Sequence, residues 1–212
     1  MPPSTLSAPE DGRFASQSAG AHGFSLLELM VTVAIVAILG TLAAPSFQTL
    51  LQANKTRAVA GELLASLNLA RSEAMRRGQP VSVCPSSNGS SCATGGTDWD
   101  RGWIVLVNED GVSEGSTPAV DASEQVLQVR QDLPTRITVR PNGNFTNGIT
   151  FLRTGLVWGL GTGTFAVCAN GDLNRSQAIL VIATRSVPAT DSDGNGIPEK
   201  GDGTNLQSCT SP

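Results

Sequence analysis

The sequence predicts an α+β protein, in which one long N-terminal helix precedes an antiparallel β-sheet domain. Two patterns lead to this class. From residue 24 to about residue 77, apolar residues recur at three- and four-residue steps, as in a helix. Beyond Gly78, short apolar runs alternate with turn residues, as in antiparallel strands. A helix followed by a series of strands is typical of the α+β class.

The first part of the predicted helix has the composition of a membrane-spanning segment. Residues 1–22 are polar and rich in Ser, Ala, Pro and Gly, which predicts an unstructured leader. Residues 24–44 contain one charged residue, Glu28, and are long enough to cross a hydrocarbon core of about 30 Å. A secretory signal peptide would begin with a basic region, whereas one arginine and two acids precede this run. We therefore expect a transmembrane helix over residues 24–44.

Residues 45–78 are expected to continue the helix as an amphipathic segment. Apolar residues recur on one side, and most charged residues occupy the other faces. Gly78 ends the helix, and Arg76 and Arg77 lie in the last turn, where the helix dipole favours cations. A helix of this length measures roughly 80 Å at about 1.5 Å per residue. A domain of this size cannot enclose such a rod, so half of the helix should lie in a membrane or a polymer.

The remaining residues, 79–212, are expected to form a β-rich globular domain that packs on the second half of the helix. The segment contains seven or eight short runs with strand character, separated by turn residues. The predicted strands cover residues 81–84, 103–107, 125–130, 137–140, 149–152, 156–158, 165–169 and 178–184.

The junction between the leader and the apolar run resembles a known processing signal. Gly23 is followed by Phe24, then by Glu28 and Pro45 at fixed spacings. This string resembles the type III signal of type IV pilins and pseudopilins. The resemblance implies that a prepilin peptidase cuts after Gly23 and that Phe24 becomes the N-methylated first residue. Residues 1–23 would then be a cleaved prepilin leader, and Glu28 and Pro45 would be the fifth and twenty-second mature residues.

The single carboxylate in the apolar run needs a physical reason, because a charge in a membrane helix is costly. The resemblance implies that the amine of a neighbouring subunit's Phe24 pairs with Glu28. Pairing offsets the desolvation cost that each charge alone would carry. It would also set the axial register between subunits. The alternative is an interfacial Glu28 that extends to the lipid headgroups.

The β region extends the resemblance. The stretches SEAMRRGQPVSVC, DWDRGWIVLVNEDG, ITFLRTG and FAVCANGDLNRSQAILVIATRS look like the minor pilins of the FimT/FimU/GspH group. Together with the signal, the resemblance covers residues 23 to about 187. It implies a pilin fold: a long N-terminal helix, membrane-spanning in its first half, packed on an antiparallel sheet.

The resemblance implies a minor type IV pilin, made as a prepilin, that takes part in initiating or capping the pilus filament. Its implied partners are other major and minor pilins, prepilin peptidase and inner-membrane lipid. Its implied place is the inner membrane, as a single-pass protein with a periplasmic globular domain. Two alternatives remain: a type II secretion pseudopilin of the GspH kind, and a DNA-binding minor pilin for DNA uptake.

Histidine content argues against catalysis. The chain's one histidine, His22, lies in the predicted leader, so the mature chain would have none. A Ser-His-Asp triad, a Cys-His pair and a His-ligated zinc site would then be excluded. We therefore expect that the protein is not an enzyme. The net charge of −4 likewise provides no global basic field for nucleic acid.

Four cysteines, Cys84, Cys92, Cys168 and Cys209, allow three disulfide connectivities. A domain outside the cytoplasm lies where disulfides persist. We favour Cys84–Cys92, which closes a small loop, and Cys168–Cys209, which ties the C-terminal tail to a strand. A cysteine metal site is disfavoured because the spacings are wide and no C-x-x-C motif is present.

An acidic segment near the C-terminus resembles a calcium loop. Oxygen donors fall at its first, third, fifth, ninth and twelfth positions, a backbone carbonyl at the seventh and glycine at the sixth. Calcium is therefore a candidate cofactor, and the alternative is a solvated Asp/Gly turn. The candidate ligands are Asp191, Asp193, Asn195, the carbonyl of Ile197, Glu199 and Asp202.

DNA binding would need a local basic patch. Arg185 lies where some FimT-like proteins carry a GRxR motif, which is missing from the expected mature chain. Arg153 and Arg175 are candidates to join Arg185 in space. Two or three phosphate contacts would give weak, salt-sensitive binding. The alternative is that these arginines line a solvated sheet edge and discourage strand pairing.

Overall fold

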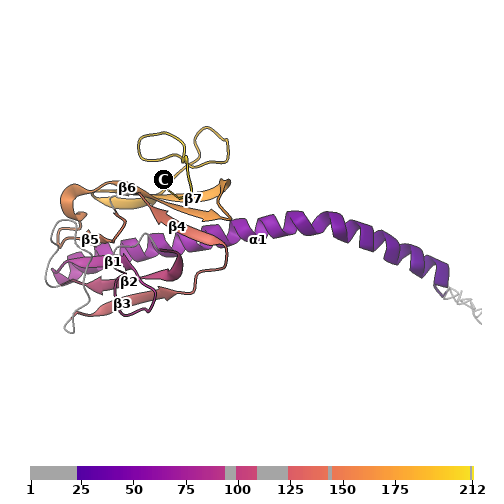
Figure 1. The fold of residues 1–212 in the computed structure, drawn as a ribbon, viewed down its shortest axis with the longest axis horizontal. Helices are drawn as coiled ribbons and strands as arrows, with labels where there is room; N and C mark the ends of the chain where they lie inside the picture. The colour runs from indigo at the N-terminus through magenta and orange to yellow at the C-terminus, as the bar shows by residue number, and fades with distance from the viewer. Residues whose placement is uncertain (1–22, 94–98, 109–123, 143–144, 211) are drawn as a thin grey trace, which may run out of the picture. The chain divides into compact units, whose positions relative to one another are not determined.

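A computed structural model describes residues 23–93, 99–108, 124–142, 145–210 and 212. The chain divides into two compact units, residues 1–45 and residues 46–212. Helix α1 (Leu26–Arg77) contributes to both units, and strands follow it in the second (Figure 1). The described residues contain eight strands. The predicted order of one long helix and then short strands is therefore confirmed.

Local signals account for both ends of α1. The Ser25 hydroxyl accepts a hydrogen bond from the backbone N–H of Glu28 at 3.2 Å and so caps the first turn. At the other end, the Gly78 N–H donates to the carbonyl of Ala74 at 3.0 Å. Gly78 has a φ of 69°, a left-handed conformation that glycine adopts without steric cost. The helix thus ends where the sequence predicts.

Four antiparallel strands form the first sheet. They are β1 (Val81–Pro85), β2 (Gly102–Val107), β3 (Val126–Gln131) and β5 (Ile149–Phe151), in the order β3-β2-β1-β5. All residues of β1 and β2 are buried, because both faces of these strands are covered. Gly102 is required between β2 and β3: a Cβ there would lie 2.0 Å from the Arg130 carbonyl oxygen.

The second sheet is also antiparallel. It contains β4 (Ile137–Pro141), β6 (Gly163–Ala169), β7 (Asp172–Ile182) and β8 (Arg185–Pro188), in the order β4-β6-β7-β8. The strands form two four-stranded sheets, whereas the sequence pattern predicted one. Both sheets and the buried side of α1 contribute residues to one core.

Two strand predictions need correction. Residues 156–158 do not form a strand: Val157 makes one isolated bridge to Phe151, and a 3-10 helix (Trp158–Leu160) follows. Gly159 within it has a φ of 68°, which breaks the extended backbone. The predicted strand 178–184 begins six residues earlier, at Asp172, and β8 was missed. The exposed start of β7 lacks apolar alternation, so periodicity could not find it.

The core is anchored by two tryptophans. Trp103 is fully buried on β2, and its indole N–H donates to the Ser66 hydroxyl of α1 at 2.9 Å. Trp99 precedes β2 and packs edge-to-face on Phe165 of β6, with ring centroids 5.0 Å apart. Both indoles therefore bridge elements that lie far apart in the sequence.

Candidate functional site: an exposed apolar helix and two clamped loops

The predicted processing residues lie at the start of α1. Gly23 and Phe24 precede the helix, and Phe24 is 81% exposed. Glu28 lies in the first helical turn, where the unpaired backbone N–H groups favour a carboxylate. Among the described residues, no ion pair includes Glu28. Within one chain, then, the described structure gives this carboxylate no cationic partner.

The first half of α1 is apolar and exposed on all sides. Its apolar window has a mean hydropathy of 2.4 and is 0% buried, and α1 is the one described helix long and apolar enough to cross a membrane. An apolar surface of this extent is unstable in water and needs lipid or protein around it. The exposed large side chains are Phe24, Leu26, Leu27, Leu29, Met30, Val31, Val33, Ile35, Val36, Ile38, Leu39, Leu42, Phe47, Leu50 and Leu51.

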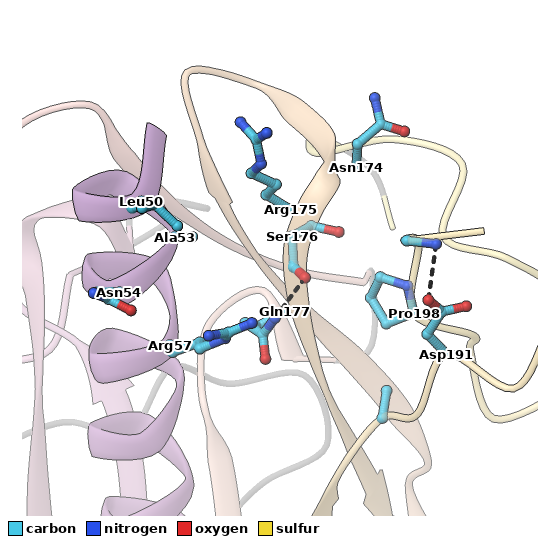
Figure 2. Close-up of a pocket in the computed structure, with 12 residues that line it drawn as sticks. Leu50, Ala53, Asn54, Arg57, Asn174, Arg175, Ser176, Gln177, Asp191 and Pro198 are labelled. Atoms are coloured by element: carbon cyan, nitrogen blue, oxygen red, sulfur yellow. Dashed lines mark hydrogen bonds between the residues drawn. The ribbon is translucent and has the colours of Figure 1, made fainter. Parts of the chain in front are cut away.

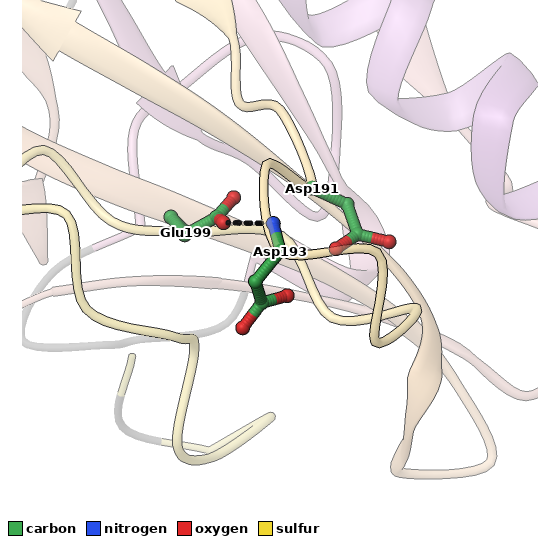
Figure 3. Close-up of side chains that lie close together, drawn as sticks. All are labelled: Asp191, Asp193 and Glu199. Atoms are coloured by element: carbon green, nitrogen blue, oxygen red, sulfur yellow. Dashed lines mark hydrogen bonds between the residues drawn. The ribbon is translucent and has the colours of Figure 1, made fainter.

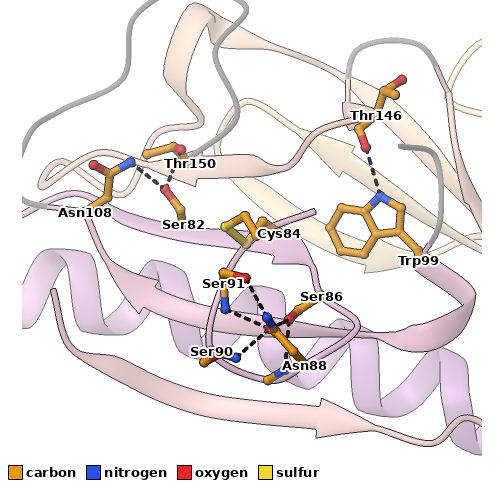
Figure 4. Close-up of a disulfide and its surroundings, with 12 residues drawn as sticks. Ser82, Cys84, Ser86, Asn88, Ser90, Ser91, Trp99, Asn108, Thr146 and Thr150 are labelled. Atoms are coloured by element: carbon orange, nitrogen blue, oxygen red, sulfur yellow. Dashed lines mark hydrogen bonds between the residues drawn. A yellow bond between two sulfur atoms is a disulfide. The ribbon is translucent and has the colours of Figure 1, made fainter. Parts of the chain in front are cut away.

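The favoured disulfide pairing is present, and the first bond holds a small loop over the first sheet. Cys84 and Cys92 are bonded, with Cα atoms 5.5 Å apart. The Asn88 side-chain oxygen accepts hydrogen bonds from the backbone N–H groups of Ser90 and Ser91, which organises the loop between the cysteines (Figure 4). The cysteines pack with Ile104 and Leu106, separately from the main core. Successive strand residues face opposite sides of a sheet, so this loop covers the face turned away from α1.

The second disulfide holds the C-terminal tail against the second sheet. Cys168 on β6 is bonded to Cys209 in the C-terminal tail. Leu206 in the tail is buried and packs with Ala166 and Cys168. The bond closes a loop of 41 residues, for which chain-entropy models give about 4 kcal/mol of stabilisation. Each sheet therefore has its outer face covered by a disulfide-bonded segment.

The predicted calcium loop brings three carboxylates together. Oxygen atoms of Asp191, Asp193 and Glu199 lie within 4.8 Å of one another (Figure 3). The Asp191 carboxylate accepts three backbone N–H groups from Gly194, Asn195 and Gly196 at 2.8–3.1 Å. These bonds wrap the loop around the carboxylate. The N–H of Asn195 also donates to Asp193 and holds the pKa of that carboxyl below its ordinary value.

Glu199 closes this loop. One carboxylate oxygen, Oε1, accepts the backbone N–H groups of Ser192 at 2.7 Å and Asp193 at 3.2 Å. The other, Oε2, is buried and has no hydrogen-bond partner among the described residues. A buried carboxylate oxygen without a partner is costly, so this atom is the one in the loop that a bound cation would satisfy.

The remaining predicted ligands have different positions. The Asn195 side-chain oxygen accepts the N–H of Ile197 at 2.8 Å and stays within the loop. Asp202 does not join the carboxylate cluster, which corrects the prediction. Its carboxylate accepts the N–H and hydroxyl of Thr204, and the Thr204 hydroxyl holds the Asp202 pKa below its ordinary value. Asn205, which is not among the predicted ligands, instead donates a hydrogen bond to Asp193 at 3.3 Å.

The structure does not assemble the predicted three-arginine patch. Arg185 pairs with Ile182 across the β7–β8 turn, whereas Arg175 lies seven residues earlier on β7. At about 3.3 Å per residue, this separates the two arginines by roughly 23 Å. Arg153 lies in the turn after β5, nearer to Arg185, because the Val157 N–H donates to the Ala183 carbonyl at 2.9 Å. The DNA hypothesis is thereby reduced to Arg153 and Arg185.

These features define a class of protein. An exposed apolar helix that continues into a disulfide-clamped β domain is the architecture of a pilin-like assembly subunit. Comparison of the chain with protein-family models identifies the same class. The family model described as type II transport protein GspH matches residues 59–185, and the prokaryotic N-terminal methylation motif matches residues 19–44. The chain belongs to the GspH family of minor pilins and pseudopilins.

One solved structure supports the fold, and two further matches are weaker. The type IV minor pilin FimU of Pseudomonas aeruginosa is 22% identical, with a TM-score of 0.54 over 74% of this chain and 96% of that chain. A second crystal form of that pilin is also 22% identical, with a TM-score of 0.48 over 72% of this chain and 98% of that chain. The minor pseudopilin EpsH of the Vibrio cholerae type 2 secretion system gives 0.40 at 11% identity, over 65% and 98%. No curated protein sequence matches the chain.

Proposed function

We propose that this chain is a prepilin that is cleaved after Gly23 and then initiates or caps a pilus filament as a minor subunit. The observation that carries the proposal is the exposed apolar surface of α1, which leaves a helix built for contact with lipid and then with other helices. Before assembly, residues 24–44 would anchor the chain in the inner membrane, with the β domain in the periplasm.

Assembly then follows from charge pairing in an apolar environment. Cleavage would create a cationic amine at Phe24, four residues before Glu28. Between neighbouring subunits, the amine of one and the carboxylate of the other would neutralise each other. In a low-dielectric bundle an unpaired charge is strongly unfavourable, so one axial register would be preferred over its neighbours.

Mass spectrometry of the mature chain tests the processing step. The expected N-terminus is a methylated Phe24, and Gly23→Val should leave the leader attached because the larger side chain blocks cleavage. As a matched control, Gly40→Val changes a helical glycine whose added Cβ would meet no atom within 4 Å; it should be processed normally. An unprocessed wild-type chain in cells with active prepilin peptidase would contradict the proposal.

Glu28→Gln tests the register step separately. This variant should be cleaved and methylated but should fall out of isolated filaments, because the neutral amide no longer pairs with the amine. Glu62→Gln is the control, since Glu62 pairs with Arg130 on the β domain. Equal incorporation of both variants would refute the pairing.

A pseudopilin of a type II secretion system is the alternative with the same fold. Purification of the membrane complex from cells, with the full chain as bait, distinguishes the two. Recovery of other minor pilins and the major pilin supports the pilus role. Recovery of secretion components in their place supports the pseudopilin role.

We also propose that the loop over residues 191–199 binds calcium. Its donors are oxygens alone, which suit a hard cation. Asp191, Asp193 and Glu199 would supply charge, and the Asn195 side chain and the Ile197 carbonyl would supply neutral oxygen. The buried, unpartnered Oε2 of Glu199 supports this proposal. A cation there would hold the C-terminal tail, because Asn205 is bonded to Asp193.

Thermal unfolding of the full chain tests the calcium proposal. With a Kd near 0.1 mM, about 1 mM calcium would add about 1.4 kcal/mol of stability, or a few degrees in Tm. Asp193→Asn combined with Glu199→Gln should abolish this rise. Asp172→Asn, which changes an exposed acid on β7, should keep it. An identical rise with magnesium, or none with calcium, would count against the site.

A further inference from the structure

Two grooves flank helix α1 between residues 48 and 57. Each takes four helix residues at the i, i+3, i+4 and i+7 steps that define one helix face. The two sets are offset by two residues, or about 200° around the helix axis, so the grooves lie on opposite sides of α1. One set is Leu50, Ala53, Asn54 and Arg57, and the other is Gln48, Leu51, Gln52 and Lys55.

The first groove, of about 460 Å³, lies between α1 and β7. Figure 2 shows Arg57 extending from the helix toward Gln177, with Arg175 on the β7 wall. Leu50, at the start of this helix face, is 63% exposed. The groove therefore combines an apolar side chain with two cations.

The second groove, of about 410 Å³, repeats this composition on the other side of the helix. Lys55 supplies the helix cation, and Arg136, which precedes β4, supplies the second. Leu51 provides the exposed apolar side chain. A hydrogen bond between the side chains of Gln52 and Asn170, at 3.2 Å, fixes this helix face against the β6–β7 turn.

The two grooves together contain four cationic side chains, although the net charge of the whole chain is −4. Lys55, Arg57, Arg136 and Arg175 are all exposed, and none belongs to an ion pair among the described residues. Of the residues that line the grooves, Asp191 is the one acid, and its carboxylate already accepts three backbone N–H groups. The grooves thus present positive charge that the described chain does not neutralise.

We propose that the two grooves bind the phosphate headgroups of anionic phospholipids. The apolar surface of α1 continues past residue 44 through Phe47, Leu50 and Leu51. Residues 24–51 span about 41 Å at the rise of a helix, which is longer than the roughly 30 Å hydrocarbon core, so a helix tilt of about 40° would keep Leu50 and Leu51 in apolar contact. Lys55 lies one helical turn, about 6 Å, beyond Leu51 and would then be at the depth of the headgroup layer. Flexible lysine and arginine stems then reach the phosphates while the leucines stay in apolar contact.

This inference rests on the proposed membrane insertion of residues 24–44. The test uses the full chain in non-ionic detergent, mixed with equal amounts of phosphatidylglycerol and phosphatidylcholine of the same acyl chains. Native mass spectrometry counts the lipids retained. The wild-type chain should retain phosphatidylglycerol about tenfold over phosphatidylcholine, with up to two copies bound, and the preference should fall as salt rises.

Variants assign the binding to the grooves. Arg57→Gln with Arg175→Gln should remove one bound copy, and Lys55→Gln with Arg136→Gln should remove the other. The control, Arg153→Gln with Arg185→Gln, removes the same charge at the far end of β7 and should bind as the wild type does. Equal loss in the control would overturn the proposal.

Two further outcomes would also overturn it. Displacement of phosphatidylglycerol by millimolar glycerol phosphate would show a site for free phosphate, not for lipid. Equal retention of both lipids by the wild type would refute headgroup recognition while leaving membrane insertion intact. A chain that retains no lipid and stays soluble without detergent would instead contradict the membrane insertion in the proposed function.

Discussion

The two halves of helix α1 have the same backbone and opposite surroundings. Residues 26–44 are exposed on every side although they are almost all apolar. In the second half, a stripe of apolar residues is fully or almost fully buried against the two sheets, and charged residues occupy the other faces. The buried stripe contains Val59, Leu63, Leu67, Ala70 and Ala74.

The contrast shows that hydrophobicity alone does not say what a helix packs on. A one-sided stripe matches a partner within the chain, because only one face can meet the core. A helix that is apolar on every face has no side that favours water, so it suits lipid or a bundle of other helices. One continuous helix thus connects a folded domain to an assembly segment.

Leu67→Ala should give the largest difference between the halves. Leu67 is fully buried in the core, so its truncation should lower the free energy of unfolding by about 2–5 kcal/mol through lost burial and a residual cavity. Leu39→Ala, in the exposed half, should leave the unfolding of the β domain unchanged. Chemical denaturation of both full-length variants in detergent checks this. Similar losses would mean that the first half also supports the domain.

Ser66→Ala should have a smaller effect. It leaves the buried indole N–H of Trp103 without its acceptor, which costs about 1–3 kcal/mol. Thr41→Val is the matched change in the first half, where the hydroxyl donates to the Ile38 carbonyl of its own helix; it should be neutral for domain unfolding. The same denaturation curves measure both, and intrinsic tryptophan fluorescence reports changes around the buried Trp103 indole.

Glu73→Gln should have the smallest effect and the clearest pH signature. Hydrogen bonds from Arg76 and Arg77 lower the pKa of Glu73 from 4.5 to about 2. A carboxyl with a depressed folded-state pKa stabilises the fold above its unfolded value and loses this contribution as pH falls toward 2. The Tm gap between wild type and variant should therefore be present at pH 6 and close near pH 2. A gap that does not change over this range would rule out the linkage.

Local signals made much of the fold predictable. The helix ends at Gly78 because the left-handed position and the cations before it are local features. The strands around Trp103 and Phe165 were found because buried strands give short apolar runs. The β6–β7 hairpin was missed although Asn170 and Gly171 both have positive φ, as a two-residue turn requires. That Asn-Gly pair was the available signal.

The candidate site also contains residues that the sequence predicted and residues that it could not predict. The sequence pattern indicated Asp191, Asp193 and Glu199, because a calcium-like loop is defined by spacing within one short segment. It could not show that Asp202 would bond to Thr204 in its own turn, or that Asn205 would reach Asp193. The sequence pattern could not predict the two grooves either, because each combines a helix cation with an arginine more than 80 residues away in the chain.

By itself, the sequence determined the long helix, the apolar segment that starts it and the processing motif. These depend on composition and spacing along the chain, which the chain carries in any conformation. Only the tertiary structure decided that the strands divide into two sheets, that each disulfide covers one outer face, and that Arg175 lies with Arg57 and away from Arg185. Those features depend on which distant residues pack together, because burial and charge proximity are properties of the folded chain.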